Sequence, residues 1–409
     1  MSALRNNLGR GFAPEFRLAL ACVRWPLRDD DREEIQHLAR GPLDWPWFTR
    51  IIEAHQVSPL AYRNLREAVS DLVPEEIASG LHSNAISNAR RSLSQAAELA
   101  RVVEIFETAG IQATALKGVP LSIVAFDDPT IRQCIDIDIL IDRDNVFEAE
   151  RLLLQAGYNR TSPKAELTPR RSKFYLKYHK DFSYFSATRG IAVELHWRLF
   201  QSASLPMQLT GNSLSRSQIH IGSKAVSSLS GNDLFVYLCV HGAIHAWESL
   251  KWLADVGALL NRMTEEELAN AIARASALDA LAEVSAGLML VRQFLGIDRC
   301  ENESLLDERD SAVKRIVRFS AALLTAHEYC QTHQQIPRAR IFWYTIFLRP
   351  DWSYRIACIA DQLVLPNDWD RINLPDALFP LYLGIRPFSW LIRRRPAPTS
   401  TTRVDPSHP

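Results

Sequence analysis

The sequence predicts a mixed α+β protein, in which a small mixed β-sheet is flanked by N-terminal and C-terminal helical regions. Apolar residues recur near the helical period before residue 110 and again after residue 231. Between them, residues 135–141 alternate with a period of two, which is typical of a strand. The expected divisions are an N-terminal helical cap (1–85), an α/β core (86–230), a C-terminal helical region (231–395) and a disordered tail (396–409).

The composition is that of an ordinary globular protein. The chain has 409 residues, of which 47% are hydrophobic and 23% charged, and 47 basic residues balance 47 acidic ones. This neutrality gives no global reason to expect a nucleic acid partner, although a local basic groove stays open. The six cysteines have no close pairs and are expected to be reduced core residues. No secretory signal and no apolar run of about 18 residues is evident, so we expect a cytoplasmic location.

Helices are expected in the first quarter of the chain, over residues 15–40, 44–70 and 75–109. Gly80 is the favoured break in the last of these, and Gly110 ends it. In the core, the same signals predict a strand over 111–116, a helix over 146–156 that Gly157 ends, one long strand over 173–185, and a strand over 190–197. Further helices are expected over 233–263 and 265–330.

Asp136 and Asp138 project from one face of the strand at 135–141, because side chains on a strand alternate. Two like charges among apolar neighbours need a compensating positive charge. Mg²⁺ or Mn²⁺ is a natural source, since carboxylate oxygens suit both ions. The strand alone equally allows an edge strand whose polar face is wet.

Two flanking segments favour the metal interpretation. Lys117 and Gly118 stand where the first core strand turns into a helix, and a glycine there lets backbone amides approach a phosphate. The strand at 190–197 carries Glu194 and His196 on one face. A third carboxylate on a neighbouring strand is what a two-metal phosphoryl or nucleotidyl transfer site requires.

A polar stripe marks the helix expected over 233–263. At about 100° per residue, five side chains fall on one of its faces: His241, His245, Glu248, Trp252 and Asp255. His241 and His245 have the spacing of a zinc pair, but no third ligand is evident. A satisfied structural network is the favoured interpretation, the wall of an active cleft follows, and a zinc site comes last.

Taken together, these residues resemble the uncharacterised nucleotidyltransferase family of the DNA polymerase β-like superfamily. The resemblance is carried by Leu-Lys-Gly at 116–118, Arg132, Asp-Ile-Asp-Ile-Leu at 136–140 and Glu-Leu-His-Trp at 194–197. It extends to 43–45, 57–60 and 241–255, roughly the first two-thirds of the chain. The superfamily usually has Gly-Gly or Gly-Ser in the turn where this chain, like its subfamily, has Lys117-Gly118.

The resemblance implies an enzyme that moves a nucleoside monophosphate from a nucleoside triphosphate, with ATP expected first, to a hydroxyl-bearing acceptor. The implied catalytic residues, which also bind Mg²⁺ or Mn²⁺, are Asp136, Asp138 and Glu194. The implied nucleotide contacts are Lys117, Gly118, Arg132 and His196. We expect a small molecule or a protein as acceptor, with nucleic acid less favoured, and no pattern indicates the oligomeric state.

Other interpretations stay open. A catalytically silent binding or regulatory protein could use the same scaffold, although the presence of all three carboxylates argues against a lost site. The same site could also transfer a pyrophosphoryl group. Lys117 could be a surface lysine, Arg132 could pair with one of the two aspartates, and His196 could be a buried histidine beside Trp197. His179 is a weaker site candidate.

Overall fold

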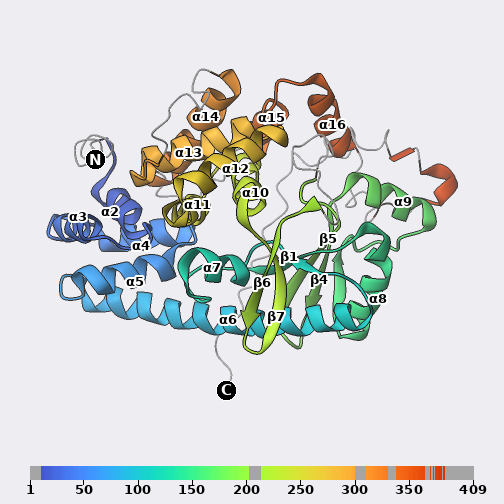
Figure 1. Ribbon diagram of the computed structural model, residues 1–409, viewed down its shortest axis with the longest axis horizontal. Helices are drawn as coiled ribbons and strands as arrows, with labels where there is room; N and C mark the ends of the chain where they lie inside the picture. The colour runs from blue at the N-terminus through green and yellow to red at the C-terminus, as the bar shows by residue number, and fades with distance from the viewer. Residues whose placement is uncertain are drawn as a thin grey trace.

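A mixed β-sheet lies at the centre of the protein (Figure 1). The computed structural model describes residues 11–201, 213–299, 310–329, 338–363, 369, 372, 374–379 and 381–382. Within these residues the sheet has seven strands in the order β3-β4-β5-β2-β1-β7-β6, and helices surround it. The predicted α+β class is confirmed, whereas the predicted disordered tail lies outside the described residues.

Parallel and antiparallel pairs both occur in the sheet. The strands are β1 (Thr114–Ala115), β2 (Asp136–Leu140), β3 (Asn159–Ser162), β4 (Asp181–Ser186), β5 (Ile191–His196), β6 (Arg216–Ile221) and β7 (Lys224–Leu229). β2 pairs parallel with β5, and β1 pairs parallel with β7, while the other neighbours are antiparallel. β1, β2 and β5 confirm three predicted strands, whereas the sequence patterns did not predict β3, β6 and β7.

One face of the sheet is apolar and is covered by two helices. Ile137 and Ile139 of β2 and Val193 and Leu195 of β5 are buried in one cluster with side chains of α6 (Glu75–Thr108) and α8 (Val146–Gln155). Figure 1 shows α6 running beneath the sheet. Because side chains alternate along a strand, the intervening residues of β2 and β5 point to the opposite face.

Four shorter helices precede α6: α2 (Pro14–Cys22), α3 (Asp29–Ala39), α4 (Trp45–Ala54) and α5 (Ser58–Val69). They divide the two helices predicted over 15–40 and 44–70. The predicted break at Gly80 is wrong, since α6 is continuous over 34 residues. One glycine costs a helix only about 1 kcal/mol, which packing along a long helix offsets. The boundary proposed at 85–86 falls inside α6, and the domain division stays a prediction.

The single long strand predicted over 173–185 is wrong. α9 (Pro169–Tyr178) occupies its first half, and β4 begins only at Asp181. The Thr168 hydroxyl caps α9 by accepting from the Arg171 backbone N–H, and Pro169 fills the first helical position. The buried Arg171 and Tyr175 lie one helical turn apart. The sequence feature that indicates a helix here is Thr168 followed by Pro169, a typical helix start.

Helices dominate the chain after the sheet: α10 (Gly231–Ile244), α11 (Leu250–Arg262), α12 (Glu265–Ala277), α13 (Leu281–Leu295), α14 (Ser311–Tyr329), α15 (Arg338–Ile346) and α16 (Trp352–Leu363). The continuous helix predicted over 233–263 is wrong, because a turn separates α10 from α11. Ala246 and Trp247 take left-handed backbone conformations there, with φ of 52° and 49°. Ser249 then caps α11 by accepting from the Lys251 backbone N–H.

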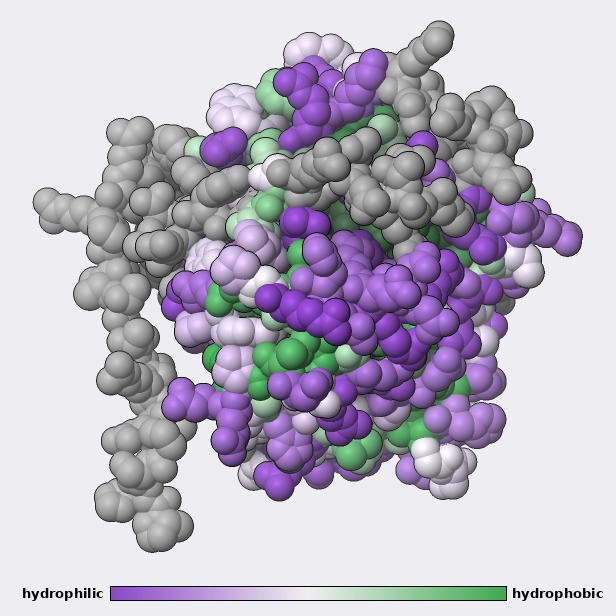
Figure 2. Space-filling model, turned by 90° about the vertical axis from the view of Figure 1, so that its left-hand side faces the viewer, coloured by the Kyte–Doolittle hydropathy of each residue, from purple (hydrophilic) through white to green (hydrophobic). Residues whose placement is uncertain are grey.

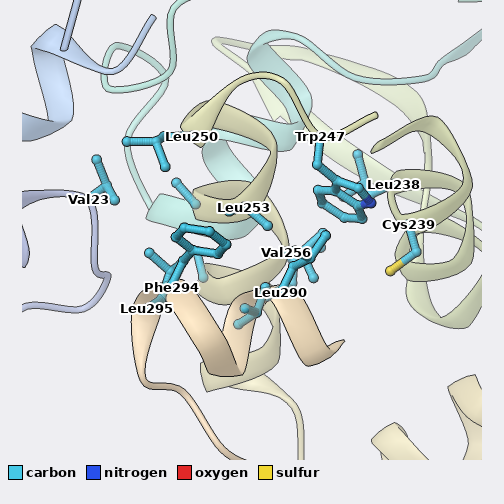
Figure 3. Packing of buried hydrophobic residues seen from close by; sticks show 14 of the residues in the cluster. Val23, Leu238, Cys239, Trp247, Leu250, Leu253, Val256, Leu290, Phe294 and Leu295 are labelled. Carbon is cyan, nitrogen blue, oxygen red and sulfur yellow. The ribbon is translucent and has the colours of Figure 1, made fainter. Parts of the chain in front are cut away.

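Trp247 fixes the turn between α10 and α11. Its side chain is fully buried, and Figure 3 shows the indole beside Leu238 and Cys239 of α10. The ring lies so close to Gly242 that a Cβ atom there would come within 2.6 Å of it. Only glycine therefore leaves room for the indole at this point of α10.

Replacing Gly242 by alanine should lower the free energy of unfolding by about 1–3 kcal/mol, because the indole and the helix must move apart. Gly80→Ala is the matched control, since that glycine is exposed, helical and has no atom within 4 Å of its added Cβ. This control should instead stabilise the protein by about 0.5–1 kcal/mol. Urea unfolding of both variants measures the difference, and stabilisation by both substitutions would contradict the packing argument.

The surface on the left of Figure 1 is largely hydrophilic, with separate hydrophobic patches (Figure 2). Among the described residues, no helix is both long and apolar enough to cross a membrane. The four cysteines in this part of the chain, Cys22, Cys134, Cys239 and Cys358, are buried and free, as predicted. The same prediction for Cys300 and Cys330 lies outside the described residues.

Candidate active site

Several polar side chains share the face of the sheet opposite α6. Between the parallel strands β2 and β5, Asp138 is level with Glu194, and Leu140 is level with His196. Between the antiparallel strands β4 and β5, Asp181 is level with His196. Residues level with one another on neighbouring strands point to the same face. Strand alternation therefore collects five ionisable side chains of β2, β4 and β5 there: Asp136, Asp138, Asp181, Glu194 and His196.

His196 links two of the carboxylates. Its Nε2 atom lies 3.2 Å from Asp138 Oδ1 and 3.3 Å from Glu194 Oε2. Asp138 and His196 are almost fully buried, whereas the Glu194 side chain keeps 28% of its exposure. The structure thus brings Asp138 and Glu194 together, as expected from the sequence, and leaves Glu194 as the more accessible of the two. His196 is buried, but it is engaged with both carboxylates.

Lys117 supplies the nearest positive charge. Its Nζ atom lies 3.0 Å from Asp138 Oδ2, and its side chain is only 19% exposed, so it is not a surface lysine. The next residue, Gly118, has a φ of 80° and stands at the N-terminal cap of α7 (Val119–Phe126). Glycine adopts this backbone conformation without a steric penalty. The turn therefore aims Lys117 at the carboxylates while it starts a helix.

The two aspartates of β2 differ in their electrostatic environment. Burial by itself would raise the pKa of Asp138, but the charge of Lys117 and the hydrogen bond from His196 hold that pKa far below its usual range. Burial and the neighbouring charge of Asp138 raise the pKa of Asp136. Asp138 is consequently kept ionised, while at Asp136 the positive charges of Lys117 and His196 do not outweigh burial and the neighbouring carboxylates. A bound cation would relieve this imbalance.

His196 is held by opposing influences. Burial and the charge of Lys180 lower its pKa, but the hydrogen bonds to Asp138 and Glu194 raise it more, so that its pKa lies above the usual value. In the structure, its Nε2–H is therefore the donor that satisfies the two carboxylates.

Lys180 and Asp181 also belong to this group of charged side chains, and the sequence patterns did not predict them as site residues. Lys180 Nζ lies 2.5 Å from Asp181 Oδ2 and 3.7 Å from Glu194 Oε2. Asp181 Oδ2 in turn lies 3.9 Å from His196 Nδ1. These residues stand where β4 begins. Because one strand was predicted over 173–185, the start of a strand at this point was not recognised. The signal that could have found them is the Lys-Asp pair immediately before the alternating apolar residues Phe182 and Tyr184.

Arg132, a predicted phosphate contact, is committed elsewhere. Its Nε atom lies 2.9 Å and 3.0 Å from the two carboxylate oxygens of Asp255 on α11, and its Nη1 donates to Cys134 Sγ. Both members of the Arg132–Asp255 pair are buried. The alternative partners suggested by the sequence, Asp136 and Asp138, are not the ones that the structure shows. A phosphate role for Arg132 stays a prediction.

His179 lies in the aromatic core. Its ring stacks on Tyr175 at a centroid distance of 4.1 Å, and its Nδ1 lies 3.0 Å from Gln201 Nε2. Burial lowers its pKa to about 4. Neither contact involves the carboxylates, which agrees with its weaker standing as a candidate.

The predicted polar stripe is divided between two helices but stays partly assembled. The rings of His241, His245 and Trp252 contact one another across the turn, and Asp255 binds Arg132. Glu248 is half-buried, and burial raises its pKa. Among the described residues, no group of three His, Cys, Asp or Glu side chains with metal-ligand spacing includes either histidine. The zinc interpretation therefore gains no support.

One group in the described part of the chain has the spacing of a metal site: Asp138, Glu194 and His196. A ligand atom from each lies within 4.8 Å of those of the others. The two carboxylates suit a divalent cation, because carboxylates are the preferred ligands of Mg²⁺ and Mn²⁺. Asp136, two residues before Asp138 on the same face, is the remaining acidic group of the strand. The residues present therefore fit such an ion.

A comparison with protein families gives one match. Residues 41–296, more than half of the 409-residue chain, match the model of a family described as an uncharacterised nucleotidyltransferase. The matched residues include the whole sheet, the carboxylates and helices α10 and α11. A comparison with curated proteins finds no match. Because this match covers more than half of the chain, it establishes that the chain belongs to the uncharacterised nucleotidyltransferase family.

Proposed function

We propose that the protein is a metal-dependent nucleotidyltransferase that moves a nucleoside monophosphate from a nucleoside triphosphate to a hydroxyl-bearing acceptor and releases pyrophosphate. The observation that carries the proposal is the pairing of Asp138 with Glu194 on adjacent parallel strands, within reach of a shared cation, in a chain of this family. ATP is the donor we expect, and a small molecule or a protein is the acceptor.

Asp136, Asp138 and Glu194 are the proposed ligands of Mg²⁺ or Mn²⁺ in a two-metal arrangement. Such ions supply positive charge that lowers the pKa of the acceptor hydroxyl and balances the charge that develops on pyrophosphate. His196 would orient Asp138 and Glu194 through its hydrogen bonds to both. Burial and the charge of Asp138 raise the pKa of Asp136, so a cation bound there would stabilise its charged form.

The turn at Lys117 and Gly118 is the proposed binding site for the triphosphate. The positive φ of Gly118 and the start of α7 leave backbone N–H groups at this turn, which favours a phosphate. Lys117 carries the charge, and it stands 3.0 Å from Asp138, so phosphates bound here would lie beside the carboxylates. Lys180, near Glu194, is a second positively charged side chain on this face of the sheet.

During transfer, the acceptor oxygen forms a bond to the α-phosphorus while the bond from that phosphorus to the pyrophosphate oxygen breaks. The hydroxyl proton needs an acceptor. Glu194 is the proposed base, because it is the more exposed carboxylate and can reach a bound hydroxyl. Positioning and electrostatics would supply most of the rate enhancement.

The test is incubation of the protein with each α-labelled nucleoside triphosphate, Mg²⁺ or Mn²⁺, and a cell extract. Nucleotidyl transfer predicts label in a new molecule together with an equal amount of pyrophosphate. Release of α-labelled nucleoside monophosphate without free pyrophosphate would instead identify a pyrophosphoryl transferase. Recovery of intact triphosphate with every nucleotide and both ions would support a catalytically silent binding protein.

A further inference from the structure

Three aromatic side chains at the turn between α10 and α11 form one surface, which we call the ring wall: His241, His245 and Trp252. Their ring centroids lie 4.6 Å apart for the two histidines, 5.2 Å for His245 and Trp252, and 5.7 Å for His241 and Trp252. His245 is exposed, and the other two are partly exposed. The proposed transfer chemistry gives these rings no role.

The ring wall is built on a rigid support. Ala246 and Trp247 hold left-handed backbone conformations between the two histidines and Trp252, and non-glycine residues adopt such conformations at an energetic cost. The buried Trp247 indole keeps the turn in place. The far side of the turn is tied to the N-terminal helices, because Ser249 Oγ donates to the His55 carbonyl oxygen at 2.6 Å. Strained turns held this firmly are concentrated at functional sites.

The ring wall stands beside the carboxylates. Trp252 lies one helical turn before Asp255 on α11, and Asp255 holds Arg132, which is four residues before Asp136. From the other helix, Tyr237 lies 5.8 Å from His241 and extends the row of rings along α10. α11 also packs against α7, whose N-terminal cap is Gly118. The ring wall therefore includes a residue of the helix that packs against the helix of the proposed triphosphate turn.

The chemistry of the ring wall favours a neutral, planar ligand. Desolvation by the atoms packed around them lowers the pKa of His241 well below its usual value and that of His245 to about 4, so both histidines are uncharged near neutral pH. Uncharged rings have little attraction for phosphate, but they offer flat surfaces for stacking. Among the described residues, the three side chains have contacts with one another and no hydrogen-bond partner. Their outer surface is thus available to another ring.

We propose that the ring wall stacks the base of the nucleoside triphosphate, with Trp252 and His245 as its principal contacts. This inference rests on the proposed function, because the triphosphate must first occupy the turn at Lys117 and Gly118. Stacking needs only the π-face of a base, so it would add affinity for all four nucleotides, with purines bound more tightly.

The test compares binding of ATP, GTP, CTP, UTP and inorganic tripolyphosphate, each with Mg²⁺, to the full-length chain and its variants by isothermal titration calorimetry. Trp252→Ala should weaken nucleotide binding about 10-fold or more and leave tripolyphosphate binding unchanged. Trp252→Phe should restore most of the affinity, because it keeps a stacking ring. His245→Ala should also weaken nucleotide binding and leave tripolyphosphate binding unchanged. Because His245 is more exposed than Trp252, this substitution should not disturb the packing of the core.

Trp352→Ala is the matched control, because Trp352 lies on α16 and is 73% exposed. This variant should bind every ligand as the unmodified protein does. Equal losses for nucleotides and tripolyphosphate in the Trp252→Ala and His245→Ala variants would overturn the inference, as would unchanged nucleotide affinity in both. If the unmodified protein binds neither nucleotides nor tripolyphosphate, the proposed function fails as well. If it binds both but the ring variants change nothing, only the base site is wrong.

Discussion

Replacing Asp138 by asparagine should abolish tight Mn²⁺ binding and reduce nucleotidyl transfer at least about 100-fold. Among the described carboxylates, Asp138 alone contacts both Lys117 and His196, and those contacts keep it ionised in a buried position. The amide has nearly the same shape but brings no negative charge, so the variant removes cation affinity with little change in packing. Free Mn²⁺ measured by electron paramagnetic resonance reports binding, and pyrophosphate release reports turnover.

Asp144→Asn is the control for the loss of one negative charge. Asp144 is exposed in the short 3₁₀ turn after β2, so this variant should bind Mn²⁺ and turn over normally. Near-ultraviolet circular dichroism of both variants checks that the fold is kept. Undiminished Mn²⁺ binding by a folded Asp138→Asn variant would remove the proposed metal site. Lys117 would then be the permanent partner of that carboxylate, as in a catalytically silent protein.

The part of the site that the sequence predicts is the part fixed by strand alternation. Asp136 and Asp138 alternate with isoleucines, so the burial of Ile137 and Ile139 against α6 forces both carboxylates to the other face. Glu194 follows by the same logic on β5. The side of the sheet to which a side chain points depends on the position of the residue in its strand and on which side of the sheet is buried. Both can be predicted from the residues of that strand alone.

The remaining features depend on contacts between distant segments. Arg132 and Asp255 are 123 residues apart, and nothing near either residue identifies the other as its partner. The turn after α10 likewise escapes prediction, because Ala246 and Trp247 are not residues that favour a left-handed conformation. It forms because Trp247 fills a space beside two glycines, Gly242 and Gly287, of which Gly287 belongs to another helix. The helical periodicity of the sequence therefore continues past Ile244, where tertiary packing ends α10.

Replacing Asp255 by alanine should lower the free energy of unfolding by about 3–5 kcal/mol, because it leaves the buried Arg132 guanidinium without its partner. Burial opposes the charged form of Arg132, but Asp255 outweighs this and raises its pKa further, so the group stays charged when the partner is removed. Urea unfolding measures the loss. An Asp255→Ala variant as stable as the unmodified protein would show that the pair contributes no net stability.

The double variant Arg132→Met/Asp255→Leu separates anchoring from phosphate binding. Replacing both members of a buried ion pair with apolar residues of similar volume is often neutral for stability, so this variant should recover most of what Asp255→Ala loses. If Arg132 contacts the triphosphate, as the family resemblance implies, the double variant should be folded but bind tripolyphosphate more weakly. If it only anchors α11 beside β2, tripolyphosphate affinity should be unchanged. The bonds of Nε to Asp255 and of Nη1 to Cys134 leave the second N–H of Nη1 and both N–H groups of Nη2 without a partner among the described residues, so a phosphate contact would be made through these groups.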